Sequence, residues 1–325
     1  PIPSLTATPT PIPLLRTSLL TNAWFEDDSS LTALSHKGAQ SAAETYGLAY
    51  ALIVTSDMET AILSRVAAGD DVIITVGEDL SSFTRQAAVS YPGIVFIGVG
   101  QPETESVPRP VILGGAGTRH DQIAFVAGVI AGLQTETRVA GSVVPAGDLR
   151  GRKYANGFLH GVRLVCGPCE VWSVDVEEYG VKDNGTDAVQ RLLEVGTDTL
   201  FAAPGAAGKA AIKAAVNVGV AVIGAGHDYY SNPFARGEIA GSEHLLGSVI
   251  YRPDVILDTV MSDILNDVLP SGPIPFSFGS GTLDVVIPNG SHLSPAARDI
   301  TMDVIARLTS GELSTGVDPL TGEEQ

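Results

Sequence analysis

Seven residues that could hold a small molecule follow apolar runs of the sequence, at the points where those runs end. They are Trp24, Asp27, Asp28, Glu78, Gly205, His227 and Asp228. Parallel strands present their carboxyl ends at one edge of a sheet, and ligands bind at that edge. An aromatic ring stacks on a flat apolar ring, and carboxylates hold hydroxyl groups. The set therefore suits binding of a small polar or aromatic molecule better than its chemical conversion.

The sequence lacks the arrangements that catalysis needs. It has no Gly-x-Ser-x-Gly elbow, and its six histidines show no metal-ligand spacing. Adjacent residues such as His120 and Asp121 diverge in a helix or a strand, so they form no dyad. The stretch 204–211 resembles a phosphate-binding loop, but Ala203 and Ala210 occupy two of its required positions. We therefore expect a protein that is not an enzyme and has no cofactor and no metal site.

The two cysteines form the motif Cys166-Gly-Pro-Cys169, which matches a thioredoxin active site. That redox chemistry needs the first cysteine at a helix N-terminus, where the helix dipole lowers the pKa of the thiol. Here a helical pattern precedes the motif and a strand pattern follows it. We expect a structural disulfide at a helix-to-strand turn, which is typical of an oxidising compartment.

Short apolar runs rich in Val and Ile alternate with helical patterns along the chain. The clearest runs are 48–54, 71–77, 94–100, 138–145, 198–205 and 220–226. Each run is too short for a buried helix and reads as a strand covered on both faces. Strands of this kind alternating with helices predict a parallel α/β sheet.

The length of 325 residues favours two α/β lobes, and the alternation restarts near residue 138. We expect a Pro/Thr-rich linker at 1–13, a first lobe of 14–117 with 245–270, and a second lobe of 118–244 with 271–325. Residues 276–288 alternate like an antiparallel hairpin, and the acidic end of the chain reads as a loose tail. A chain that returns to its first lobe forms a hinged cleft that closes around a ligand.

Composition narrows the class of partner. The formal net charge of −18 argues against nucleic acid and anionic membranes as partners. No apolar run approaches the length of a membrane span. The Pro/Thr-rich start resembles the segment that follows a removed export signal or a lipid-anchored N-terminus, so we expect an exported protein.

Several motifs, in order and at matching spacing, resemble one known family. They lie at 22–38, 74–78, 91–96, 125–131, 154–161, 196–205 and 224–228. The chain resembles the basic membrane protein family of substrate-binding lipoproteins, relatives of the purine nucleoside receptor that serve ABC transporters. The resemblance covers most of residues 15–265.

The resemblance implies a type I periplasmic-binding-protein fold, with two doubly wound lobes joined by a hinge. It also implies an extracytoplasmic, lipid-anchored and monomeric protein that binds a nucleoside and delivers it to an ABC permease. In the family, a Phe of the first loop stacks on the base, and an Asp of the last strand holds polar groups of the ligand. The positions that correspond to the family's pocket make Asp27, Asp28, Glu78, Gly205, Asp228 and Tyr251 candidate ligand contacts, with Glu78 standing where the family has a Phe.

The chain departs from the family pattern within the pocket. Leu31 stands where the stacking Phe is expected, and Tyr251 replaces a Lys. Trp24 and Phe25 replace two glycines and offer a stacking surface from another direction. Two alternatives to a purine nucleoside therefore stay open. One is another ligand, such as a flavin, a nucleobase or a sugar, and the other is the ligand-sensing ectodomain of a signalling system.

Overall fold

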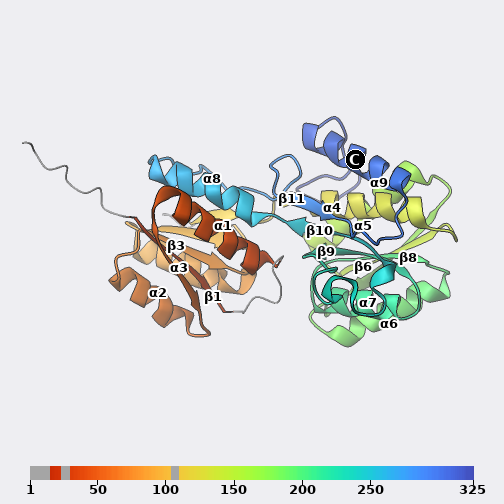
Figure 1. Ribbon diagram of the computed structural model, residues 1–325, viewed down its shortest axis with the longest axis horizontal. Helices are drawn as coiled ribbons and strands as arrows, with labels where there is room; N and C mark the ends of the chain where they lie inside the picture. Colours follow the sequence, from red (N-terminus) through yellow and green to blue (C-terminus); the bar gives the residue numbers. More distant parts are fainter. Residues whose placement is uncertain (1–14, 23–29, 104–109) are drawn as a thin grey trace, which may run out of the picture.

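The computed structural model describes residues 15–22, 30–103 and 110–325. Figure 1 shows two lobes side by side along the long axis, each built around its own sheet. Within the described residues, no helix is both long and apolar enough to cross a membrane.

The sheet of the first lobe has five parallel strands in the order β2-β1-β3-β4-β5. The strands are β1 (Arg16–Thr21), β2 (Ala49–Val54), β3 (Val72–Val76), β4 (Val95–Val99) and β5 (Val111–Leu113). Helices α1 (Leu31–Tyr46), α2 (Met58–Ala67) and α3 (Ser81–Ser90) cover it, with a short 3₁₀ turn at Glu78–Leu80. Leu19 and Leu20 belong to different core clusters, because neighbouring strand residues point to opposite faces.

The sheet of the second lobe has six strands in the order β11-β10-β9-β8-β6-β7. They are β6 (Val139–Pro145), β7 (Glu170–Val176), β8 (Thr199–Ala202), β9 (Ala221–Gly226), β10 (Leu245–Tyr251) and β11 (Leu283–Val286). All pairs are parallel except β10 with β11. Its helices are α4 (His120–Gln134), α5 (Leu149–Val165), α6 (Lys182–Glu194), α7 (Ala206–Val216) and α9 (Pro295–Ser310).

Helices α4 and α5 pack closely because glycines face backbone atoms along their contact. A Cβ added at Gly128, Gly157 or Gly161 would clash with backbone of the other helix. Helix α4 is buried from His120 to Ala131, with α9 on its outer side in Figure 1. This pair of helices therefore forms a fixed base for the side chains at their N-terminal ends.

The described chain passes between the lobes three times, and these passages form the hinge. They are residues 114–119, Arg252, and residues 266–282 after α8 (Pro253–Leu265). Two passages are hydrogen-bonded to each other, since Gly114 N donates to Ile274 O at 2.8 Å and Arg119 N donates to Phe276 O at 2.9 Å. Gly114 takes a φ of 102°, which favours glycine.

The structure corrects one lobe assignment. Residues 245–270 were expected in the first lobe, but β10 pairs with β9 and β11 in the second sheet. The run 245–251 is apolar and buried almost throughout, which fits an interior strand of either sheet, and its pairing with β9 and β11 decides the lobe. The chain returns to the first lobe only with α8, which packs along α1 (Figure 1) so closely that Gly38 faces the backbone of Asp254.

The expectation for the end of the chain is also wrong. Residues 276–288 form no hairpin of their own, because β11 pairs with β10 instead. The acidic tail is tied to the second lobe: Asn156 Nδ2 donates to Gly322 O at 2.7 Å, and Arg152 pairs with Glu323 at 2.6 Å. Its carboxylates meet basic side chains of α5, which holds the tail in place.

Candidate ligand-binding site

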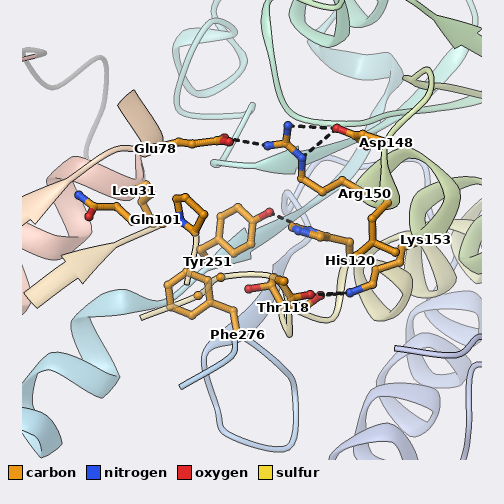
Figure 2. A pocket seen from close by; sticks show the side chains of 16 residues that line it. Leu31, Glu78, Gln101, Thr118, His120, Asp148, Arg150, Lys153, Tyr251 and Phe276 are labelled. Carbon is orange, nitrogen blue, oxygen red and sulfur yellow. Dashed lines mark hydrogen bonds and ion pairs between the residues drawn. The ribbon is translucent and has the colours of Figure 1, made fainter. Parts of the chain in front are cut away.

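A cavity of about 340 Å³ lies between the lobes, beside the hinge. It is lined from the first lobe, the hinge and the second lobe by Leu31, Glu78, Gly100, Gln101, Pro102, Gly114, Gly115, Ala116, Thr118, His120, Asp148, Leu149, Arg150, Lys153, Tyr251 and Phe276. Figure 2 shows Glu78 and Leu31 opposite Arg150, His120 and Lys153, with Tyr251 and Phe276 between them. The volume lies within the range of small-molecule sites.

An ion pair crosses the cavity from one lobe to the other. Arg150 Nη1 lies 2.9 Å from Glu78 Oε2, and Arg150 Nη2 lies 3.1 Å from Asp148 Oδ2 (Figure 2). Glu78 follows β3 because Gly77 turns the chain with a φ of 118°. Asp148 caps α5 by accepting a hydrogen bond from Gly151 N at 2.7 Å. The side chains of Glu78 and Arg150 are 61% and 51% exposed, so a ligand can reach both.

Three polar rings meet at the inner wall of the cavity. His120 Nδ1 lies 3.0 Å from the Tyr154 hydroxyl and 3.4 Å from the Tyr251 hydroxyl. Burial, followed by the positive charges of Lys153 and Arg150, lowers the pKa of His120 to about 3. The ring is therefore neutral at physiological pH, with one donor and one acceptor nitrogen. The ring of Tyr251 also packs on Phe276, with centroids 5.3 Å apart.

Lys153 brings a buried ammonium group to the cavity from α5. The residue is fully buried, and Nζ donates to Ala116 O at 2.7 Å and to Thr118 O at 3.3 Å. Burial lowers its pKa, while the charge of Asp121 acts in the opposite direction. Both carbonyl groups belong to the hinge passage 114–119, so Lys153 ties the second lobe to the hinge.

The Asp121 carboxylate is hydrogen-bonded to residues other than Lys153 and His120. Arg119 donates two hydrogen bonds to its carboxylate, at 2.9 and 2.6 Å, and Thr315 donates a third at 2.6 Å. His120 faces Tyr154 instead, so the two adjacent residues form no dyad, as the sequence predicted.

The residues that the sequence singled out fall into three groups. Glu78 and Tyr251 line the cavity, together with Leu31 at the position of the family's stacking Phe. Gly205 precedes α7 as its N-cap with a φ of 137°, His227 stacks on Tyr229 with ring centroids 4.2 Å apart, and Asp228 accepts hydrogen bonds from Tyr230 N and Ser231 Oγ. None of the three is among the residues that line the cavity. Trp24, Phe25, Asp27 and Asp28 lie outside the described residues.

The cysteines lie where the sequence placed them. Cys166 follows the last residue of α5, β7 begins at Glu170, and the Sγ atoms of Cys166 and Cys169 are at bonding distance. No group of three or more His, Cys, Asp and Glu side chains in the described ranges is arranged to hold a metal ion.

Sequence reasoning missed His120, Asp148, Arg150 and Lys153. Asp148 and Arg150 follow a strand, so the rule that strand ends carry the site would have found them. Lys153 and His120 gave no comparable signal, because a helical pattern does not tell which polar residue faces a cleft. This arrangement of charged, hydroxyl and aromatic groups can hold a small molecule that has both a flat face and polar edges.

Solved structures with the same fold cover nearly the whole chain. A transcriptional activator of the comK gene from Bacillus halodurans gives a TM-score of 0.72 at 16% identity, over 92% of this chain and 99% of that chain. An ABC transporter solute-binding protein from Conexibacter woesei gives 0.70 at 14% identity, over 92% and 98%. Another from Aeropyrum pernix K1 gives 0.66 at 16% identity, over 92% of each. These likenesses show the type I periplasmic-binding-protein fold.

The family is identified by sequence. The curated proteins gave no significant match. A family model described as that of PnrA-like ABC transporter substrate-binding proteins, the Bmp family, matches residues 17–274. That stretch includes parts of both lobes. It contains the first two hinge passages and the third as far as Ile274, together with every residue that lines the cavity except Phe276. The chain therefore belongs to the Bmp family of PnrA-like ABC transporter substrate-binding proteins.

Proposed function

We propose that the protein captures a small aromatic or polyhydroxylated metabolite outside the cytoplasm and delivers it to an ABC permease, with a purine nucleoside as the first candidate. The observation that carries this proposal is the cavity between two hinged lobes, lined from both of them. Closure of such lobes around a ligand gives a permease one shape to recognise. The lipid anchor and the monomeric state that the resemblance implies belong to the same proposal.

The chemistry of the cavity supports a ligand with a ring and hydroxyl groups. Tyr251 and Phe276 supply aromatic surface. The Tyr251 hydroxyl and the neutral His120 ring supply donors and acceptors at the inner wall, and the Glu78 carboxylate supplies acceptors at the exposed side. A nucleoside presents a flat base and paired ribose hydroxyls, which fit these groups. The cysteine pair at bonding distance supports an oxidising, extracytoplasmic location.

Two measurements test the ligand class. Native mass spectrometry of the purified protein would show a co-purified ligand, and calorimetry would measure binding of adenosine, guanosine and inosine beside riboflavin, free bases and sugars. Saturable 1:1 binding of a purine nucleoside supports the proposal. Binding of another class alone replaces the ligand and keeps the solute-binding role, and absence of any binding contradicts the role itself.

A pair of matched variants locates the site. Tyr251→Phe removes a hydroxyl group that lies 3.4 Å from His120 Nδ1, and Tyr50→Phe removes one that lies 2.8 Å from His36 Nδ1 in the first lobe. Only the first of these tyrosines lines the cavity. We expect Tyr251→Phe to weaken binding about 5- to 10-fold and Tyr50→Phe to leave it unchanged. Equal effects of the two changes would place the ligand elsewhere.

A further inference from the structure

Lys153 carries a buried positive charge that no carboxylate in the described part of the chain contacts directly. Within the described ranges, Nζ donates hydrogen bonds to the carbonyl oxygens of Ala116 and Thr118, and no carboxylate lies at ion-pair distance from it. Asp121, the strongest of the acidic neighbours acting through space, is already bonded to Arg119 and Thr315. Charged groups that are fully buried are ordinarily paired, because removal from water is costly.

The other charged side chains of the described lining form a group apart from Lys153. Arg150 contacts two carboxylates, Glu78 and Asp148, so this group has no surplus positive charge. Glu103 and Asp318 reach Lys153 only as weaker charges through space. Among the described residues that line the cavity, Lys153 is therefore the cation without a carboxylate in direct contact.

Lys153 also has hydrogen-bonding capacity to spare. An ammonium group has three N–H donors, and two carbonyl oxygens accept from this one. The side chain is among those that line the cavity, and Figure 2 shows it extending from the second lobe toward Thr118. The lowered pKa of His120, which comes first from burial and then from the charges of Lys153 and Arg150, agrees with a positive potential there.

We propose that Lys153 binds an anionic group of the ligand, so that the captured metabolite is an aromatic or polyhydroxylated molecule bearing one carboxylate or phosphate. The inference rests on the proposed function, because it assigns a substrate class to the same cavity. An anion at Nζ supplies the missing countercharge through a charge-assisted hydrogen bond. Since Lys153 also holds two hinge carbonyl groups, the bound anion would fix the hinge passage 114–119 together with the ligand.

Pairs of neutral and anionic probes test the inference by calorimetry. The pairs are adenosine with adenosine 5′-monophosphate, riboflavin with flavin mononucleotide, uracil with orotate, and glucose with glucuronate. We expect the anionic member of at least one pair to bind 10- to 100-fold more tightly than its neutral partner. The phosphate pairs and the carboxylate pairs distinguish the two sources of negative charge.

Two variants assign the effect to one side chain. Lys153→Met removes the charge at similar volume, and the control Arg152→Met removes the same charge one residue away, where the side chain is half exposed and paired with Glu323. We expect Lys153→Met to abolish the preference for the anion and Arg152→Met to retain it. If Lys153→Met fails to fold in a thermal melt, Lys153→Gln keeps a donor for the hinge carbonyl groups without the charge.

The results separate this inference from the proposed function. Equal or tighter binding of the neutral member in every pair overturns the inference, and the proposed function stands if those neutral compounds bind. A preference for the anion that survives loss of the Lys153 charge also overturns it. Absence of binding by all eight probes overturns the inference and counts against the proposed function as well. The comparison of probes on the unmodified protein is decisive even if both variants unfold.

Discussion

Replacement of Gly157 by alanine tests whether the close contact of α4 and α5 positions the cavity. An alanine Cβ at residue 157 would lie 2.9 Å from the Asp121 Cα and closer still to its carbonyl oxygen. Both atoms belong to the backbone, so no side-chain rotation can relieve the clash. The helices would have to part by several tenths of an ångström, at the level of His120 and one turn from Lys153.

The magnitude follows from two opposing effects. Overpacking costs about 1–3 kcal/mol, and a clash between two backbones belongs at the upper end of that range. Alanine offsets about 1 kcal/mol of this cost, because it favours the helix more than glycine does. We therefore expect Gly157→Ala to lower the free energy of unfolding by about 2 kcal/mol and the Tm by about 4 °C.

Thermal unfolding with and without ligand measures both consequences. Leu164→Ala is the control on the same helix, because that side chain is 45% exposed and its loss should change stability by less than about 0.5 kcal/mol. We also expect Gly157→Ala to weaken ligand binding, since it moves Lys153 relative to the hinge carbonyl groups. A Tm for Gly157→Ala that equals or exceeds that of the unmodified protein would refute the reasoning.

Three other predictions concern groups away from this contact. Asp70→Asn should lower the free energy of unfolding, measured in urea, by about 2–3 kcal/mol, because the buried Asp70 carboxylate accepts two hydrogen bonds from Arg65. The control is Asp303→Asn, which alters an exposed ion pair with Arg307 at 3.8 Å. It should change the free energy of unfolding by less than about 0.5 kcal/mol. Thiol titration of the unfolded protein should find no free thiol before reduction and two after it, and two before reduction would refute the disulfide. Burial and the charges of Lys153 and Arg150 lower the pKa of His120 from 6.5 to about 3, so between these values the unfolded chain binds the proton more strongly and stability falls as pH falls. His120→Gln should remove this contribution, up to about 1.4 kcal/mol per pH unit, and an unchanged slope between pH 6.5 and 4.5 would contradict it.

The strands were predictable because a strand that is buried on both faces appears in the sequence as an uninterrupted apolar run. The apolar runs at 71–77 and 220–226 coincide with β3 and β9 almost residue for residue. The lobe to which the run 245–251 belongs was not predictable in this way. Its composition shows that it is covered on both faces, but not by which neighbours.

The site was predictable only where strand ends mark it. Glu78 and Tyr251 each follow or end a buried strand, and both line the cavity. Gly205 and Asp228 also follow strands, but they serve local turns and helix starts in the second lobe. Lys153 was hidden inside the helical pattern 150–165, which does not show that this side chain is fully buried.

The passage of the chain back to the first lobe also determines when each lobe can be completed during synthesis. Helix α8, which covers α1, begins about 140 residues after β5 ends, a delay of about 7 to 30 seconds at ordinary rates of translation. Strand β11 and helix α9, which complete the second lobe, emerge soon after α8. The missing parts of both lobes therefore lie close together in the chain, so the two walls of the cleft can be completed together wherever the chain folds.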